Sequence, residues 1–321
     1  MVGIKDIAKV AGVSISTVSY ALNGSSKVTE RTRQKIMTIA NEMNYVPNMA
    51  ARTLKRQQTN IIGVYLTDYG GSFYGELLDG MKKGLELQGY EMIVCSGKQS
   101  QLFIPERMID GAIILDWSFQ SDKIVHYANQ GHQIVVLDRE LESKNIRKIL
   151  LDNVGGTCLA IEHFALANAS KVYLIAGPEK GYDSQKRLQT SQKELKMYGI
   201  DYEIIQGNFI EASGTAAAEE IMQHNPTFPL YIFALNDEMA IGIYEYFKNS
   251  SLKIGEDIRI IGFDNIEVGK FLLPRLATIS YSKHRWGMLA AQVIIQMIKQ
   301  ETIEAEQIYT TYVAGGSFPE R

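Results

Sequence analysis

The sequence predicts a small all-α head followed by a larger α/β body with parallel sheets, and two patterns lead to this prediction. In residues 1–47, apolar residues recur at intervals of three and four, which is the period of an amphipathic helix. From Ile61 onward, short β-rich runs alternate with helical patterns. Strand–helix–strand repetition is typical of parallel sheets that helices cover on both faces.

The head contains three predicted helices. The first covers residues 4–11 and ends at Gly12. Ser14 can cap a second short helix, and Thr29 can cap a third that ends before Pro47. Two short helices joined by a tight glycine-containing turn and braced by a third form a helix-turn-helix.

The charge of the chain is divided unevenly between head and body. The formal charge is −3, but residues 1–60 contain nine Lys and Arg against three Asp and Glu, which gives +6. The remainder contains 24 basic and 33 acidic residues, which gives −9. A basic head on an acidic body indicates that the head binds a polyanion. The alternative is a solvated basic surface.

The outward face of the second helix is the candidate DNA-reading surface. Ile15, Ser16 and Tyr20 point outward near its start, where a recognition helix meets base edges in the major groove. The candidate backbone contacts are hydroxyl and cationic side chains nearby: Lys5, Ser14, Thr17, Ser19, Arg31 and Arg33. The alternative is a plain three-helix bundle with a solvated polar face.

The runs "IKDIAKVAGVSISTVSYALNG" and "VTERTRQKIMTIANEMNYVPNMAARTLK" resemble the lactose/galactose repressor (LacI/GalR) family of bacterial transcription regulators. The resemblance implies that Ile15, Ser16 and Tyr20 occupy the family's three main base-reading positions. The family often has arginine at the third of these positions. Tyr20 removes that bidentate guanine reader, so the operator sequence cannot be copied from a relative.

Residues 48–60, "NMAARTLKRQQTN", connect the head to the body. A helix this short is unstable alone in water because nucleation is costly. The resemblance implies a hinge helix that pairs with its twin in the minor groove through Ala51, Leu54 and Lys55, with Leu54 wedged between base steps. A flexible Gln-rich linker is the alternative.

The body, residues 61–321, resembles the two-lobed periplasmic-binding-protein type I fold more loosely, through pieces such as "IGVYLTDYGGSFYGELLDGMKKGLELQGY", "VVLDR", "LNDEMAIG" and "IIGFDN". We expect an N-lobe at about 61–152 and 281–308 and a C-lobe at about 153–280 and 309–321. The strand candidates are "IIGVYL", "EMIVCS", "GAIILD", "QIVVLD", "KILLD", "KVYLIAG", "DYEIIQ", "LYIFAL" and "IRIIGFD". The helix candidates are Gly75–Gln88, Val154–Ala167, Ser184–Tyr198, Ala212–His224, Glu238–Lys248 and Arg285–Lys299.

Polar and aromatic residues that follow apolar strands are expected to line a cleft between the lobes. Arg187 can donate to ligand hydroxyls, and Asp264 can accept from them. Asn236 and Asp237, which follow "LYIFAL", can donate and accept at once. Phe73 and Phe209 can stack on the apolar face of a sugar ring. With the positions that the resemblance adds, the predicted effector site is Phe73, Arg139, Asp183, Arg187, Phe209, Asn236 and Asp264. For each residue the alternative is a solvated loop position or an internal salt bridge, and for Asp183 a helix cap.

Two segments depart from the family pattern. Only "GKQSQLFIPERMID" separates "EMIVCS" from "GAIILD", so the helix expected between them must be stunted or absent. That part of the N-lobe contributes to the family's dimer contact. In addition, "RLQTSQKEL" replaces a Gly-Phe pair that relatives often have after the arginine.

Other classes of protein have weak support. The chain has no Walker, dinucleotide-binding or HExxH motif, its five histidines are scattered, and no membrane-length apolar run occurs. We therefore expect no enzyme activity, no cofactor and no metal. Cys95 and Cys158 lie in apolar runs and are expected to be free thiols in a cytoplasmic protein.

The resulting prediction is a homodimeric, sequence-specific DNA-binding regulator, most simply a repressor released from its operator by a sugar-like effector. One alternative is a catabolite-control-type regulator that responds to a phosphorylated carrier protein. Those relatives carry an arginine where this chain has Gln292, although Lys283 and Arg285 are nearby. A corepressor-activated repressor is the other alternative.

Overall fold

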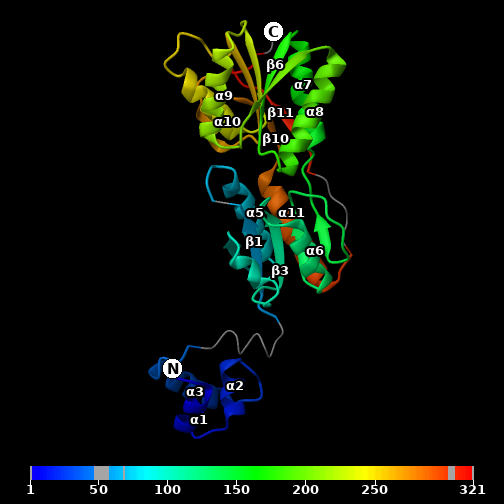
Figure 1. The fold of residues 1–321 in the computed structure, drawn as a ribbon. Coiled ribbons are helices and arrows are strands. Elements are labelled where there is room, and N and C mark those ends of the chain that lie inside the picture. The colour runs from blue at the N-terminus through cyan, green and yellow to red at the C-terminus, as the bar shows by residue number, and fades with distance from the viewer. Residues whose placement is uncertain (1, 47–57, 68, 303–307, 320–321) are drawn as a thin grey trace. The chain divides into compact units, whose positions relative to one another are not determined.

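The computed structural model describes residues 2–46, 58–67, 69–302 and 308–319. The chain divides into two compact units, Met1–Thr59 and Asn60–Arg321, which are called the head and the body below (Figure 1). Within the described ranges, no helix is long and apolar enough to cross a membrane.

Residues 2–46 of the head form a three-helix bundle, as the sequence predicts. Its helices are α1 (Ile4–Ala11), α2 (Ile15–Leu22) and α3 (Glu30–Glu42). The Ser14 hydroxyl accepts a hydrogen bond from the Thr17 amide at 3.1 Å and caps α2, while Thr29 caps α3 in the same way. Gly12 ends α1 in a left-handed conformation, with φ +69°, that a residue without a side chain adopts at little cost. The buried core of the head is Ile7, Ala8, Ala11, Val18, Ala21, Val28, Ile36 and Ala40.

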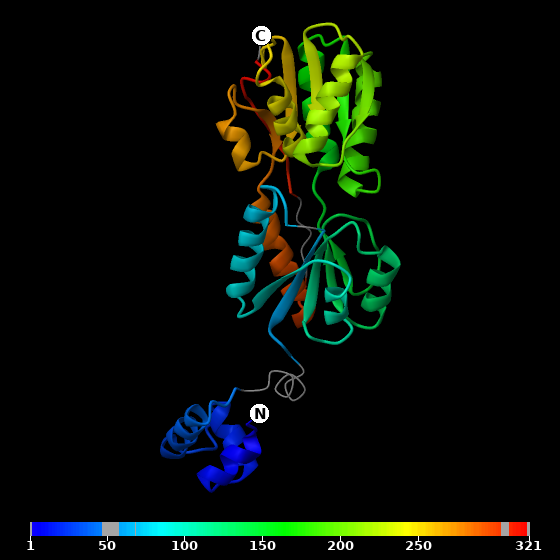
Figure 2. The same cartoon turned by 60° about the vertical axis from the view of Figure 1, so that its left-hand side comes forward.

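The N-lobe of the body is built on a five-stranded parallel sheet in the order β2-β1-β3-β4-β5. Its strands are β1 (Ile61–Leu66), β2 (Glu91–Cys95), β3 (Gly111–Leu115), β4 (Gln133–Val136) and β5 (Ile146–Lys148). Its α-helices are α5 (Tyr74–Glu86), α6 (Ser121–Asn129) and α11 (Lys283–Lys299). Figure 2 shows α5 in cyan and α11 in orange-red side by side, and the two helices pack closely against each other.

The C-lobe is built on a six-stranded sheet in the order β11-β10-β9-β8-β6-β7. Its strands are β6 (Lys171–Ala176), β7 (Asp201–Gln206), β8 (Leu230–Ala234), β9 (Ile258–Phe263), β10 (Ala277–Ser280) and β11 (Thr311–Val313). Its helices are α7 (Asn153–Leu166), α8 (Tyr182–Tyr198), α9 (Glu211–Gln223), α10 (Asp237–Phe247) and the short 3-10 helix η2 (Glu267–Phe271). Figure 1 shows α7 and α8 on one side of the sheet and α9 and α10 on the other.

The structure differs from the predicted strands and helices at several elements. The run "KILLD" is not a strand, because β5 ends at Lys148 and Leu151 forms only an isolated bridge with Ile308. The short strands β10 and β11 and the helix α6 were not among the predicted elements. Strand β11 pairs antiparallel to β10, so the C-lobe sheet is parallel except at this edge.

The crossover between β2 and β3 is short, as predicted. Residues 96–110 contain one 3-10 turn, η1 (Ser100–Phe103), and no α-helix. Ile104 and Ile109 cover the sheet face that a helix would otherwise cover, and both side chains are buried. The hydroxyl of Tyr65 on β1 donates to the Ser100 carbonyl at 3.0 Å and fixes the crossover to the sheet.

Candidate functional site

The first turn of α2 exposes the side chains predicted to read bases. Ile15 is 47% exposed and Ser16 is also exposed. Tyr20 is half-buried against the core of the head, and the Lys27 ammonium lies 5.2 Å from its ring centroid. Because its ring packs against the core of the head, the Tyr20 side chain is less mobile than the long, charged side chain of an arginine at this position.

Some of the residues predicted to contact phosphates already form hydrogen bonds within the head, and others are exposed. The Ser14 and Thr17 hydroxyls bond to each other at 2.8 Å, and Arg33 donates from Nη2 to the Ser25 carbonyl at 2.9 Å. Lys5 and Arg31 are exposed. Ser19 is half-buried in α2. The predicted hinge contacts Ala51, Leu54 and Lys55 lie outside the described residues.

A cavity of about 630 Å³ lies between the two lobes of the body. Its lining follows the carboxyl ends of strands in both sheets, which is where ligands of doubly wound α/β folds bind. Six of the seven residues predicted to bind effector line this cavity: Phe73, Asp183, Arg187, Phe209, Asn236 and Asp264.

Arg187 on α8 is the buried cation of the cavity. Its guanidinium donates from Nε to Asn153 Oδ1 at 2.8 Å, from Nη1 to the Leu235 carbonyl at 2.6 Å and from Nη2 to Asp264 Oδ1 at 3.3 Å. The guanidinium carbon lies 3.7 Å from the ring centroid of Phe263. These contacts fix the plane of the guanidinium before any ligand arrives.

Asp264 presents its carboxyl from a backbone conformation that is unusual for a non-glycine residue, with φ +108°. Its Oδ1 accepts from Arg187 and from the Tyr281 hydroxyl, the latter at 2.9 Å. Burial raises the pKa of the Asp264 carboxyl, while the charges of Arg187 and Lys283 act in the opposite direction.

Asp183 occupies the first turn of α8 and faces the same cavity. Its Oδ1 accepts from the Asn153 amide at 2.7 Å. Burial raises the pKa of this carboxyl, and Arg187 again opposes the shift. Asp183, Asn153, Arg187 and Asp264 therefore form a continuous hydrogen-bonded chain along one wall.

Asn236 and Phe209 form a second wall, and each holds the other in place. Asn236 caps α10 by accepting from the Met239 amide at 3.0 Å, and it donates from Nδ2 to the Phe209 carbonyl at 2.9 Å. Phe209 has φ +70°, and its ring covers Gly177, where any side chain would overlap the ring. Asp237, which the sequence also predicts in the cleft, does not line the cavity. It is fully buried behind this wall, and burial raises its pKa to about 8.

Arg139 lies apart from the six cavity residues. It donates from Nε and Nη2 to both oxygens of Asp138, at 2.8 Å each, and also to the main-chain carbonyls of Asp116 and Phe119. These partners use its donors inside the N-lobe. The motif "VVLDR" thus places Asp138, rather than Arg139, at the cavity.

Several polar contacts join the two lobes around the cavity. The Ser72 amide of the N-lobe donates to Glu238 Oε1 at 2.7 Å, and the Tyr182 hydroxyl of the C-lobe donates to Glu140 Oε1 at 2.8 Å. Lys148 and Lys186 each lie 3.6 Å from the same Glu140 carboxylate. Closing or opening the cavity must remake these contacts.

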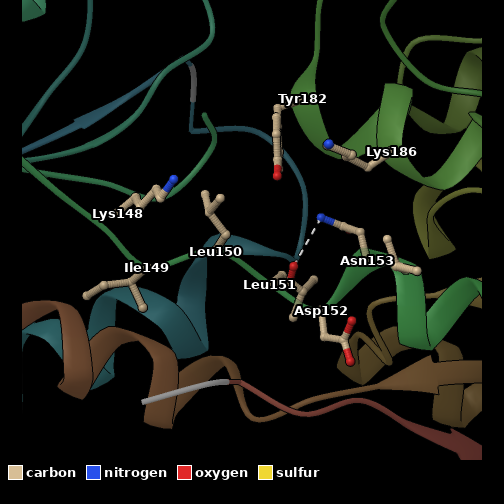
Figure 3. A pocket seen from close by; sticks show the side chains of 9 residues that line it. Lys148, Ile149, Leu150, Leu151, Asp152, Asn153, Tyr182 and Lys186 are labelled. Carbon is tan, nitrogen blue, oxygen red and sulfur yellow. Dashed lines mark hydrogen bonds between the residues drawn. The ribbon is translucent and has the colours of Figure 1, made fainter. Parts of the chain in front are cut away.

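A smaller cavity of about 340 Å³ adjoins the first crossover between the lobes. Figure 3 shows Lys148 on one side and Tyr182 and Lys186 on the other, with the Asn153 amide bonded to the Leu151 carbonyl. Asn153 therefore belongs to the lining of this cavity and to the hydrogen-bonded wall of the larger one.

Comparison with known proteins identifies the family. Residues 3–48 match the model of bacterial regulatory proteins of the lacI family, and residues 161–318 match the periplasmic binding protein-like domain. The probable HTH-type transcriptional repressor ExuR of Bacillus subtilis is 30% identical over 318 residues, which cover 96% of this chain and 95% of that protein. The chain belongs to the lacI family of bacterial regulatory proteins.

Two further relatives of this lacI-family chain are informative. The HTH-type transcriptional repressor PurR of Vibrio vulnificus is 31% identical over 313 residues, covering 94% of this chain and 93% of that repressor. The crystal structure of a sugar-binding transcriptional regulator (LacI family) from Enterococcus faecalis is 62% identical, with a TM-score of 0.79, and matches 83% of this chain and 100% of that one. The chain is therefore a DNA-binding transcriptional regulator, as predicted, and its relatives ExuR and PurR are transcriptional repressors.

Sequence reasoning missed several residues of the lacI-family cavity. Asn153 and Tyr281 bond directly to the predicted residues, while Glu238 contributes to the lining. Trp117, which the sequence offers as a packed aromatic or a further pocket residue, lines the cavity as well. Asn153 and Tyr281 both lie next to crossovers between the lobes, and that position is the signal that could have identified them. Gln292, the residue that bears on the carrier-protein alternative, is exposed on α11, and the relatives do not favour that alternative.

Proposed function

We propose that this lacI-family chain is a homodimeric repressor whose operator affinity is lowered when an uncharged sugar binds in the cavity of about 630 Å³. The observation that carries the proposal is the hydrogen-bonded wall of Asp183, Asn153, Arg187 and Asp264 facing aromatic side chains. The size of the cavity lies within the range of roughly 300–1,000 Å³ that is usual for small-molecule sites.

The wall has the donors and acceptors that a polyol needs. A guanidinium has five N–H groups, and the three described hydrogen bonds of Arg187 leave two that can donate to ligand hydroxyls. The carboxyl oxygens of Asp183 and Asp264 can accept from hydroxyls. Phe73, Phe209 and Trp117 supply the faces against which the C–H surface of a sugar ring packs.

The charge of the lining favours an uncharged ligand. Among the described residues that line the cavity, Arg187 is the only basic one, and five are acidic: Asp138, Asp183, Glu211, Glu238 and Asp264. An anionic sugar would be desolvated next to these carboxylates without a free cation to balance it. We therefore expect neutral sugars to bind and the matching uronic acids and sugar phosphates to bind at least 100-fold more weakly.

A thermal-shift screen of the full-length chain tests the ligand class, because a ligand that binds only the folded state raises the melting temperature. The screen pairs D-glucose with D-glucuronate and glucose 6-phosphate, and D-galactose with D-galacturonate, and adds D-ribose and cellobiose. Asp264→Asn should abolish the shift, while Glu211→Gln, at an exposed position of the lining, should keep it. Preferential binding of the acids would contradict the proposal.

The effect on DNA is measured separately. Duplexes selected from a random pool by the full-length chain are titrated in fluorescence anisotropy with and without the sugar. We expect a lower affinity with sugar, and a steep fall of affinity with salt because phosphate contacts dominate. A higher affinity with sugar would assign the ligand the opposite role, that of a corepressor.

An exposed apolar surface on the C-lobe supports the dimer. Leu273 is 92% exposed, Phe271 75% and Val268 41%, and the three residues lie in and next to η2. Exposed apolar groups clustered in this way mark an interaction surface, and a second copy of the chain is the occupant we propose, since a two-fold dimer matches a palindromic operator. Sedimentation at micromolar concentration should show a dimer, and Leu273→Asp should shift it toward monomer. A wild-type monomer would contradict this assembly.

A further inference from the structure

Lys283 is a buried ionisable residue that does not line the proposed effector cavity. It is the first residue of α11, directly after the second crossover, and it is only 1% exposed. Lysine is almost never fully buried without partners, because its ammonium loses its hydration. A residue with this burial therefore needs an explanation from its contacts.

The Lys283 ammonium bonds to two successive main-chain carbonyls of the effector-site loop. It donates to the Asp264 carbonyl, and to the Asn265 carbonyl at 3.4 Å. Both residues have positive φ, +108° and +47°, although neither is glycine. Such conformations persist only where the surroundings hold them in place, and they cluster at functional sites.

Other contacts hold the same loop from the C-lobe side. The Asn265 amide donates to Thr278 Oγ1 at 3.3 Å, and the Ile266 amide donates to Asp237 Oδ2 at 2.9 Å. Lys283 is the contact that comes from a helix of the N-lobe. Its Nζ also lies 3.9 Å from Glu76 Oε2 on α5, the helix that packs along α11.

We propose that Lys283 is a positioning residue for effector binding: its ammonium holds the Asp264–Asn265 turn in the shape that presents the Asp264 carboxyl to the cavity, and Glu76 ties this turn to α5. The inference rests on the proposed function, because it assigns the route by which a sugar bound at Asp264 affects the N-lobe. A ligand bound to the Asp264 carboxyl shifts the position of the turn. Because the Lys283 ammonium bonds to the turn and lies next to Glu76, this shift changes the position of α5 and α11.

A purely space-filling role for Lys283 predicts a different result. A methionine has nearly the same length and no charge, so Lys283→Met would keep the packing and remove only the two hydrogen bonds and the ion pair. A space-filling lysine would therefore lose nothing on this substitution. A positioning lysine would lose the shape of the turn and with it the sugar affinity.

The first experiment needs no ligand. Amide hydrogen exchange in the full-length chain is compared between wild type, Lys283→Met and Lys283→Arg, with Lys299→Met as the matched control. Lys299 lies on the last turn of the same helix, is exposed, and bonds to Gln88 Oε1 at 2.8 Å. We expect the amides of Asn265 and Ile266 to exchange at least tenfold faster in Lys283→Met. In Lys283→Arg these two amides should exchange nearly as fast as in wild type, and in Lys299→Met they should exchange at the wild-type rate.

The second experiment measures sugar binding and coupling. D-glucose, D-galactose, D-ribose and cellobiose are each titrated by calorimetry, and the sugar that binds wild type is carried into the anisotropy assay. Lys283→Met should raise the Kd of that sugar at least tenfold, with rescue to within threefold by Lys283→Arg. Glu76→Gln should leave the Kd within threefold and reduce the change in DNA affinity that the saturating sugar causes.

These outcomes separate the inference from the proposed function. If a sugar binds wild type and Lys283→Met changes neither its Kd nor the exchange of the loop amides, the positioning role is overturned and the proposed function stands. If none of the four sugars binds wild type, the proposed effector class is wrong, and the exchange experiment alone decides the positioning role. Unchanged exchange overturns it in that case too.

Discussion

The side-chain amide of Asn153 connects Asp183 to Arg187 in the cavity wall. Removing this amide is the sharpest test of whether these hydrogen bonds stabilise the wall. The amide nitrogen donates to Asp183 Oδ1 at 2.7 Å and to the Leu151 carbonyl at 3.4 Å, and the amide oxygen accepts from Arg187 Nε at 2.8 Å. Asn153 is 2% exposed. Asn153→Ala therefore leaves one donor and one acceptor of the wall without their buried partner.

The expected loss of stability follows from those two groups. Each buried polar group left unsatisfied costs about 1–3 kcal/mol, and charged groups cost more. The cavity of about 340 Å³ that Asn153 lines allows water to reach the freed atoms and reduces the loss. We therefore expect Asn153→Ala to lower the free energy of unfolding by about 2–3 kcal/mol. Sugar affinity should fall about tenfold, equivalent to about 1.4 kcal/mol, because the guanidinium of Arg187 loses its orientation.

Urea unfolding of the full-length chain and calorimetric titration with the sugar from the screen measure the two effects. Asn208→Ala is the matched control. Asn208 lines the larger cavity of about 630 Å³ but is exposed, and its side-chain oxygen accepts a local hydrogen bond from the Ile210 amide at 3.3 Å. The control should change the free energy of unfolding by less than about 0.5 kcal/mol. Equal losses in the two variants would refute the argument that Asn153 holds the wall.

Three further outcomes are expected. Gly80→Ala on α5 should destabilise the body by about 1–3 kcal/mol in urea unfolding, because the new methyl would overlap the carbonyl oxygen of His284 on α11. Gly75→Ala on the same helix meets open space and should stabilise by up to about 1 kcal/mol, so equal signs would refute the close packing of the two helices. The raised pKa of Asp237, about 8, means that the folded chain holds a proton that the unfolded chain releases near pH 4. The free energy of unfolding should therefore fall as pH rises between about 4 and 8, by at most about 1.4 kcal/mol per pH unit for this group. Asp237→Asn should lack this contribution, and an unchanged slope in denaturation measured across that range would count against it. Leu54→Ala should weaken binding to selected duplexes far more than binding to random duplexes in anisotropy titrations, and equal losses would count against a wedge in the minor groove.

The sequence predicts the periodic parts of this fold well and the starts of its helices less well. The six predicted body helices are all present, but each begins one or two residues earlier than its hydrophobic pattern does. The first turn of a helix is set by capping and by neighbours rather than by an apolar stripe. Asn153, Asp183, Asp237 and Lys283 all lie in such first turns, and Asn153 is the one that the sequence patterns do not single out.

The family resemblance places Arg139 in the effector site, but Arg139 is not among the residues that line the cavity. Arg139 follows an apolar strand just as the cavity residues do, and its guanidinium could have faced the ligand. It instead folds back onto Asp138 and onto the Asp116 and Phe119 carbonyls, which come from segments about twenty residues upstream in sequence. The tertiary fold decides which distant residues a side chain contacts. The local sequence around Arg139 therefore does not predict its partners.

The site residues that matter most stand beside the connections between the lobes, and this placement limits how the chain can respond to a ligand. Asn153 follows the first crossover, Tyr281 and Lys283 lie at the second, and Ile308 of the third bridges to Leu151 of the first. A coupling of about 1–3 kcal/mol is typical of allosteric regulators, and one buried hydrogen bond to a charged group is worth about 1.5–3 kcal/mol. The contact between Lys283 and the Asp264 turn is therefore of the same order as a typical coupling free energy. Under the proposed function, Asp264 meets the sugar through its carboxyl and meets the N-lobe through the bond from Lys283 to its main-chain carbonyl, so this step requires no long pathway through the sheets.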